Sequence, residues 1–151
     1  MSQKAKIDAA ELEVFRATLP ETERHERFEW LTAIYDVVMA RFLIQKEKLA
    51  AQKISVKSWA EAFGMGGPEN QERLSFNLLT GVSDGKALAE NIDPSIPIIL
   101  IEHTFKSKRK TESTTLILDG NHRVRKAFLK GQPEIEAFYL PKELSKLIKL
   151  R

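Results

Sequence analysis

The sequence predicts an α+β fold, in which α-helices in the N-terminal portion precede a small mixed sheet with helices on one side. In the N-terminal third, apolar residues recur at spacings of three and four, which is the periodicity of an amphipathic helix. After Pro97, continuous apolar runs bounded by turn residues replace that periodicity and indicate buried strands. We therefore expect a helical N-terminal extension over residues 1–65 and an α+β domain over residues 66–151.

The helices expected in the extension have identifiable caps and faces. Asp8 and Glu11 fit a capping box, which predicts a short helix that stops at Pro20. A longer helix is expected over residues 22–52, and its apolar face would pack on the domain or form a homodimer. That face consists of Phe28, Leu31, Ile34, Tyr35, Val37, Val38, Phe42 and Leu43.

Turn residues divide the middle of the chain into short elements. Residues 53–55 fit a short strand, or Ser55 caps a short helix that ends at Gly64. Two more helices are expected, over residues 69–79 and from Ser83 or Asp84 to about residue 91.

The final third predicts strands joined by a turn and a helix. Residues 98–101 and 114–118 read as a strand hairpin, with a polar, basic connection over residues 105–113. A helix over residues 124–130 would close at Gly131. A strand over residues 135–140 and a basic helix after Pro141 complete the order.

The turn between the second of these strands and the following helix carries the chemistry. It reads Asp119, Gly120, Asn121, His122 and Arg123. The first N–H groups of a helix have no internal partners and favour an anion. Gly120 would admit a phosphate close to the backbone, Arg123 would add a charged fork and His122 a donor or proton-transfer group. Asp119 would orient His122, hold a metal ion or simply cap the helix.

Positive charge is concentrated in the final third of the chain. Residues 96–151 hold 12 Lys and Arg against 6 Asp and Glu, whereas the whole chain has a net charge of +3. This excess suits a phosphate-bearing partner, or it serves as a solvated surface. Few aromatic residues that could stack on bases lie among these cations, so we expect the protein to contact the sugar–phosphate backbone of DNA. The residues expected to contact it are Lys106, Lys108, Arg109, Lys110, Arg125 and Lys126.

Composition excludes several classes of protein. Apolar residues make up 42% and charged residues 30% of the 151 residues, so a core and a polar surface are both expected. No stretch approaches the ~18 apolar residues of a membrane span. The polar first residues predict no secretory signal, and the absence of cysteine excludes disulfides, thiolate zinc sites and a cysteine nucleophile. We expect a cytoplasmic protein without a membrane partner.

Residues 69–141 resemble the ParB/sulfiredoxin superfamily. The similarity lies in the strand followed by Asp-Gly-Asn-His-Arg, in the Val-Arg-Lys-Ala helix after it, and in the Gly131, Pro133 and strand that come next. Upstream, residues 86–92 and 97–101 are similar to the family's helix and Pro-Ile strand. The resemblance implies a ParB/sulfiredoxin-like fold.

The resemblance also implies a nucleotide-binding protein of a plasmid, phage or other mobile element that acts on DNA as an NTPase, with DNase activity in some relatives. It implies ATP or CTP with Mg²⁺ as cofactors, held by Gly120, Asn121, His122, Arg123 and an upstream arginine at Arg73. By the same resemblance, Asp119, His122 and Arg123 would be the catalytic residues, and Asp119 would also bind the metal ion. Sulfiredoxin repair requires a cysteine and is excluded. The missing glutamate after the glycine argues against the CTP specificity of ParB.

Two alternatives remain at this point. In the first, the chain is a non-enzymatic module that binds DNA or a protein through its basic C-terminal face and its N-terminal helix. In the second, it is an accessory protein of a toxin–antitoxin or phage system whose N-terminal helices bind a partner enzyme.

Overall fold

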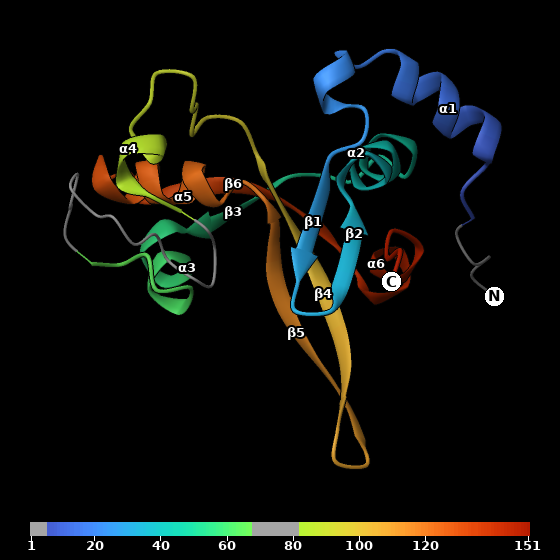
Figure 1. Ribbon diagram of the computed structural model, residues 1–151. Coiled ribbons are helices and arrows are strands. Elements are labelled where there is room, and N and C mark those ends of the chain that lie inside the picture. Colours follow the sequence, from blue (N-terminus) through green and yellow to red (C-terminus); the bar gives the residue numbers. More distant parts are fainter. Residues whose placement is uncertain (1–5, 68–81) are drawn as a thin grey trace. The chain divides into compact units, whose positions relative to one another are not determined.

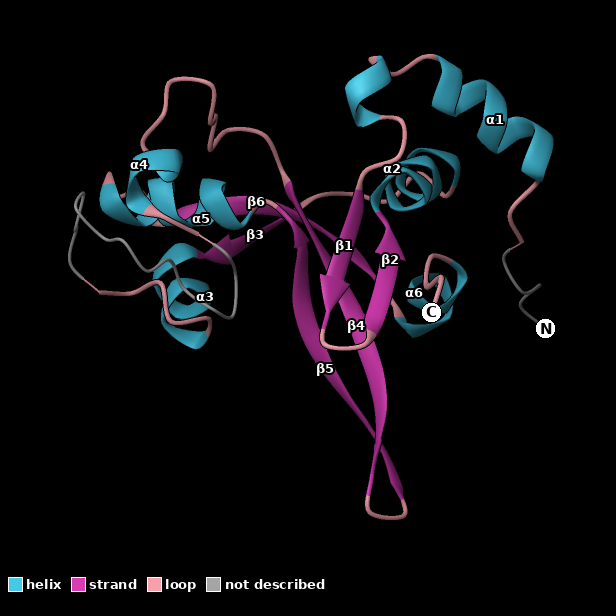
Figure 2. Cartoon of the chain, in the orientation of Figure 1, coloured by secondary structure: helices cyan, strands magenta, loops and turns pink. Residues whose placement is uncertain are grey.

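The computed structural model describes residues 6–67 and 82–151 and has a mixed α+β architecture (Figures 1 and 2). It contains a two-stranded sheet, β1-β2, and a four-stranded sheet with the strand order β3-β6-β4-β5. The chain forms two compact units, each assembled from separate stretches of sequence. None of the helices described in these two ranges has the length and hydropathy required to cross a bilayer.

The first unit comprises the described residues of 1–50, 99–119 and 139–151. Its helices are α1 (Ala9–Ala17), the 3₁₀ turn η1 (Glu21–Glu23), α2 (Val37–Lys46) and α6 (Lys142–Leu147). Its strands are β1 (Arg27–Trp30), β2 (Ala33–Asp36), β5 (Lys110–Asp119) and nearly all of β4 (Ile98–Ser107). The core is built from the buried faces of these elements, including Val38, Leu43, Ile101, Ile117 and Ile148.

The second unit comprises the described residues of 51–98 and 120–138. Helices α3 (Val56–Ala62) and α4 (Asp84–Ala87) both pack against α5 (Asn121–Leu129). Strand β3 (Gln52–Ser55) pairs antiparallel with β6 (Glu134–Leu140). Apolar side chains close this core, among them Val56, Ala60, Ala87, Val124 and Ile135. The boundary expected after residue 65 falls inside this unit.

Several predicted elements are confirmed together with their caps. The Asp8 carboxylate accepts hydrogen bonds from the N–H groups of Ala10 and Glu11 at the start of α1. Both interpretations of the segment around Ser55 hold, because β3 ends at Ser55, whose hydroxyl accepts from Ser58 N and caps α3. Gly131 ends α5 with φ +72°, and the predicted final strand and helix are β6 and α6.

The single helix predicted over residues 22–52 is wrong. In its place the chain forms η1, a β1–β2 hairpin and the shorter helix α2. Strand β1 pairs antiparallel with β2 from Arg27–Asp36 to Trp30–Ala33. Leu31, expected on a buried helical stripe, is 87% exposed at the hairpin turn. A homodimer through that long helix therefore loses its structural basis.

The sequence of residues 27–36 fits the periodicity of a helix as well as that of a strand. The aromatic and β-branched residues of 27–36 suit a strand, but their positions also match spacings of three and four. The hairpin turn gives no glycine or asparagine signal, since Leu31 itself adopts φ +54°. The informative residue is Asp36, whose carboxylate accepts from Met39 N and starts α2 as its N-cap.

The hairpin predicted from residues 98–101 and 114–118 is confirmed, but its strands are longer than expected. Strand β4 pairs with β5 antiparallel as far as Ser107–Lys110 (Figure 2). The segment 105–113, predicted as a connection, is therefore mostly strand. Lys108, with φ +52°, and Arg109 form the turn. Polar and basic residues are compatible with strands here because neither face of the hairpin arm over residues 105–113 is buried, and β4–β5 backbone hydrogen bonds do not depend on side-chain polarity.

The remaining expectations concern α4 and residues outside the described ranges. Helix α4 begins at Asp84 as predicted but ends at Ala87, earlier than expected. The predicted helix over 69–79 and the proposed nucleotide contact at Arg73 lie outside the residues that the structure describes.

Candidate functional site

The turn before α5 is built around one glycine in a conformation that other residues rarely adopt. Gly120 is the N-cap of α5 and has φ +116° and ψ 15°. A Cβ atom at this position would lie 2.3 Å from Cγ2 and 2.7 Å from Cβ of Ile98. The sequence therefore requires glycine here for backbone conformation and for close packing. The result is a helix N-terminus whose first N–H groups have no side-chain cap from the N-cap residue.

Two polar atoms in the first turn of α5 are enclosed without a hydrogen-bond partner among the described residues. They are Oδ1 of Asn121 and Nε2 of His122. Burial lowers the pKa of His122 below its ordinary value, and the charge of Lys86 lowers it further, so the imidazole is neutral near pH 7. A neutral imidazole can donate from one ring nitrogen and accept at the other. Enclosed groups of this kind are costly unless a ligand or water satisfies them.

Arg123 lies in the same turn and has a structural contact of its own. Its Nη1 group donates to the carbonyl oxygens of Ile96, at 3.1 Å, and Pro97, at 2.7 Å. The guanidinium thus ties the start of α5 to the segment that precedes β4. The sequence predicts that the guanidinium of Arg123 binds a phosphate. Because the same guanidinium also holds the backbone of Ile96 and Pro97, removing the side chain would loosen the turn.

Asp119 forms an ion pair with Arg41 within the first unit, and Arg41 also pairs with Glu26. Nη2 of Arg41 lies 3.0 Å from Oδ2 of Asp119 and 3.1 Å from Oε2 of Glu26. Burial raises the pKa of Glu26, and Arg41 opposes that rise. A guanidinium directly on this carboxylate disfavours a divalent cation at the same oxygen. Asp119 therefore fits a Mg²⁺ ligand poorly, and the described residues contain no group of three or more potential metal-binding side chains.

Two of the six residues expected to contact DNA point into the second unit. Arg125 is 2% exposed and forms a bidentate ion pair with Asp84, at 2.7 and 2.9 Å. Lys126 donates from Nζ to the carbonyl oxygens of Ala89 and Ile92. Both side chains therefore stabilise the second unit, and the proposed DNA-binding surface does not include them.

The other four expected DNA contacts gather at the end of the β4–β5 hairpin. Lys106, Lys108, Arg109 and Lys110 are all exposed. They occupy the last turn of the hairpin and the residues beside it, so four positive charges project from one short segment.

Comparisons with protein-family models, with curated proteins and with solved structures found no match to this chain.

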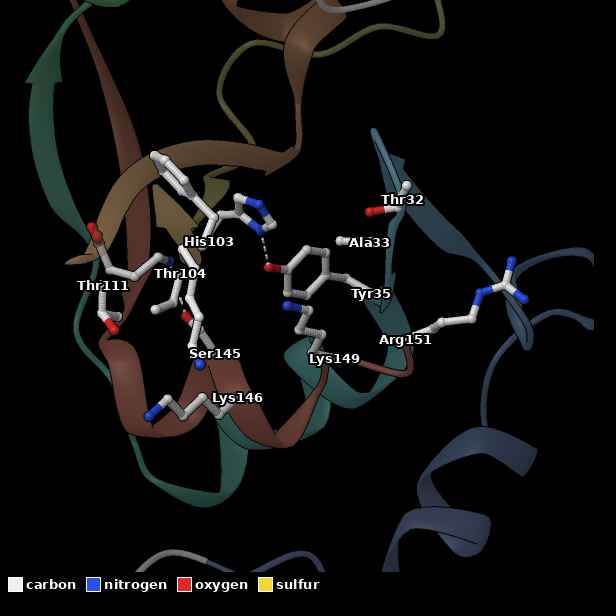
Figure 3. Close-up of a pocket in the computed structure, with 13 residues that line it drawn as sticks. Thr32, Ala33, Tyr35, His103, Thr104, Thr111, Ser145, Lys146, Lys149 and Arg151 are labelled. Carbon is white, nitrogen blue, oxygen red and sulfur yellow. Dashed lines mark hydrogen bonds between the residues drawn. The ribbon is translucent and has the colours of Figure 1, made fainter. Parts of the chain in front are cut away.

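Sequence reasoning missed a pocket in the first unit. The pocket has a volume of about 480 Å³ and brings together residues of β2, β4 and α6 with the segment after α6 (Figure 3). At its base the hydroxyl of Tyr35 and Nδ1 of His103 lie 2.6 Å apart. His103 lies beyond the strand expected over residues 98–101, but in the structure it is in the middle of β4 and is buried. No sequence signal joins these residues, because 68 positions separate Tyr35 from His103.

Acidification is expected to destabilise the fold through His103 and His122. Burial lowers the pKa of both histidines below 6.5, and Lys149 adds to this effect at His103. As pH falls through about 6.5, the unfolded chain binds more protons than the folded chain, so the free energy of unfolding declines. Urea denaturation at about pH 7.5 and about pH 5.5 measures the difference.

The matched control for this pH dependence is the exposed His25. The double variant His103→Gln/His122→Gln should show a smaller loss of stability between the two pH values than the wild type. His25→Gln should retain the full loss. Equal losses in all three proteins would contradict the assignment of the effect to the two buried imidazoles.

Proposed function

We propose that this protein binds a nucleoside triphosphate through the turn formed by Gly120, Asn121, His122 and Arg123. The observation that carries the proposal is the pair of enclosed, unpartnered atoms, Asn121 Oδ1 and His122 Nε2, in the first turn of a helix opened by left-handed Gly120. The resemblance of this segment to the ParB/sulfiredoxin superfamily supports the same site.

The two unpartnered atoms suit different parts of a nucleotide. A protonated Nε2 of His122 donates to a phosphate oxygen, next to the backbone N–H groups at the positive end of α5. Asn121 Oδ1 is an acceptor, so it suits a hydroxyl or amino donor of the ligand or a water that the ligand holds. Arg123 adds positive charge beside the turn, and Lys86 lies close enough to influence His122.

A further step of this proposal is hydrolysis of the triphosphate. The chain's contribution would be to position the phosphates and to exchange a proton at Nδ1 of His122, the ring nitrogen that carries no hydrogen when Nε2 donates to the phosphate. Mg²⁺ would supply charge neutralisation on the phosphates, but the ion pair between Asp119 and Arg41 leaves Asp119 outside this scheme.

A second function, DNA-backbone binding without turnover, is favoured by the basic end of the β4–β5 hairpin. Lys106, Lys108, Arg109 and Lys110 would bind DNA phosphates regardless of base sequence. In this case DNA retardation would weaken steeply with salt and would not depend on nucleotide.

The test is calorimetric titration of ATP and CTP, with Mg²⁺, into wild type, His122→Leu and Asn121→Ala. We expect the wild type to bind at least one nucleotide and His122→Leu to bind it about tenfold more weakly, because one hydrogen bond to a charged group is lost. Arg123→Lys is preferable to Arg123→Ala, since it keeps a cation near the carbonyl oxygens that Arg123 binds.

The control is Lys130→Ala, at the other end of the same helix, which should bind as the wild type does. If the wild type binds neither nucleotide, the proposal is wrong. Salt-sensitive DNA retardation in the absence of nucleotide would then support the second function. If binding holds, hydrolysis and DNA cleavage are measured on the same variants.

A further inference from the structure

The pocket of the first unit is framed by backbone hydrogen bonds that fix its walls. The segment after α6 runs along β2, with Asp36 N donating to Ile148 O, Leu150 N to Ile34 O, and Ile34 N to Arg151 O. These contacts place Lys149 opposite Tyr35. Across the pocket, Ser145 of α6 accepts from Glu102 N and donates to Leu140 O, which holds α6 against β4.

Positive charge dominates the lining of this pocket. Among the lining side chains, Lys106, Lys146 and Lys149 are cations, against the single carboxylate side chain of Glu102, whereas the guanidinium of Arg151 extends away from Tyr35 and His103 (Figure 3). Glu102 is engaged with the Thr115 hydroxyl across the hairpin. Within the described part of the chain, the three lysines have no ion-pair partner. A pocket with this imbalance attracts an anion.

Three neutral groups add directional contacts to this charge. Tyr35 and His103 are hydrogen-bonded to each other at the pocket base, and Lys149 extends beside Tyr35 (Figure 3). Burial and Lys149 keep His103 neutral by lowering its pKa, so one ring nitrogen remains after the contact with Tyr35. The Thr104 hydroxyl, also in the lining, is enclosed without a partner among the described residues. A hydroxyl in this position can donate to an anion.

We propose that this pocket binds a small ligand through a phosphate group. A phosphate has several oxygens that accept hydrogen bonds from different directions, which suits ammonium and hydroxyl donors carried by separate elements. A carboxylate offers only two oxygens in one plane. The volume of about 480 Å³ lies in the range of small-molecule sites. Phe105 lies parallel to His103, with ring centroids 5.9 Å apart, and is 38% exposed, so it offers an aromatic surface to the rest of the ligand.

The test is an NMR titration of the whole chain with phenyl phosphate, and with inorganic phosphate and benzoate as separate probes. We expect phenyl phosphate to shift the ring resonances of His103 and Tyr35 and to bind more tightly than benzoate. Lys149→Gln and Thr104→Val should each weaken phenyl phosphate binding by about fivefold to tenfold, because each removes one donor to the phosphate. Both substitutions keep the approximate size of the side chain.

Lys142→Gln provides the matched control, since Lys142 is an exposed lysine of α6 outside the pocket lining. It should bind phenyl phosphate as the wild type does, and so should His122→Leu, which tests the nucleotide site of the second unit separately. The proposal fails if Lys149→Gln and Thr104→Val behave like Lys142→Gln, or if the wild type binds no phosphate probe. Binding of a single-stranded oligonucleotide without binding of phenyl phosphate would also overturn it, in favour of a nucleic-acid surface.

Discussion

Asp84→Ala is expected to lower the free energy of unfolding by about 3–5 kcal/mol, the range measured when one partner of a buried ion pair is removed. Asp84 is 1% exposed and Arg125 is 2% exposed, so the remaining guanidinium would be left buried and charged. Arg125 also donates from Nη1 to the carbonyl oxygens of Met65 and Gly67, at 2.6 and 2.7 Å. Loss of Asp84 would therefore disturb the segment after α3 as well as α4. Urea denaturation measures the change.

Two further variants distinguish the stability contribution of this buried ion pair from the effect of removing an exposed charge. Glu90→Ala changes an exposed acid of the same unit and should alter stability by no more than about 0.5 kcal/mol. Asp84→Ala/Arg125→Met removes both charges and should recover much of the loss, because no unpaired charge is then buried. If Asp84→Ala costs no more than Glu90→Ala, the second unit does not depend on this pair.

Gly120→Ala is expected to cost roughly 2–5 kcal/mol, since it combines backbone strain with overpacking. The backbone at φ +116° is unfavourable for any L side chain, and the new Cβ would meet Ile98 at 2.3 Å. Thermal or urea denaturation measures the loss. The same change should abolish nucleotide binding if the turn is the phosphate site.

Gly131→Ala is the matched control for this substitution. Gly131 also has a positive φ, +72°, but a Cβ there meets nothing within 4 Å. Its expected cost is about 1–2 kcal/mol, from the left-handed conformation alone. Ile98→Ala in the Gly120→Ala background should remove part of the clash, so the two changes together should cost less than their sum. Equal costs for Gly120→Ala and Gly131→Ala would contradict the close packing between Gly120 and Ile98.

Capping residues, a helix-ending glycine and a short apolar run correctly predicted the elements that they begin, end or form. The Asp8 and Ser55 caps, the Gly131 terminus and the apolar run from Ile98 each act within a few residues, and the corresponding elements are present. The hairpin of β1 and β2 was not predictable in this way. Its turn uses Leu31 at positive φ, and its strands are stabilised by packing within the first unit.

Predictions about individual side chains depended on partners that are distant in sequence. The charge of Arg125 was apparent, but 41 positions separate it from Asp84, and this buried partner gives it a structural role. No pattern in the sequence connects Arg41 with Asp119, because 78 positions separate the two residues. The turn around Gly120 was recognisable because strand, glycine and helix are contiguous there. The pocket of the first unit was not, because its residues converge only after folding.

The division of the chain into two discontinuous units limits how the protein can be dissected. Each unit needs segments from both sides of the other, and β4 and β6 each contribute residues to both units. No single cut in the chain therefore releases an intact unit, and a truncation designed to isolate the residues after 65 would remove β3 and α3 from the unit that contains α5. Contacts between such distant segments must form before either core closes, so folding is expected to be cooperative and slow compared with a helical bundle of the same length.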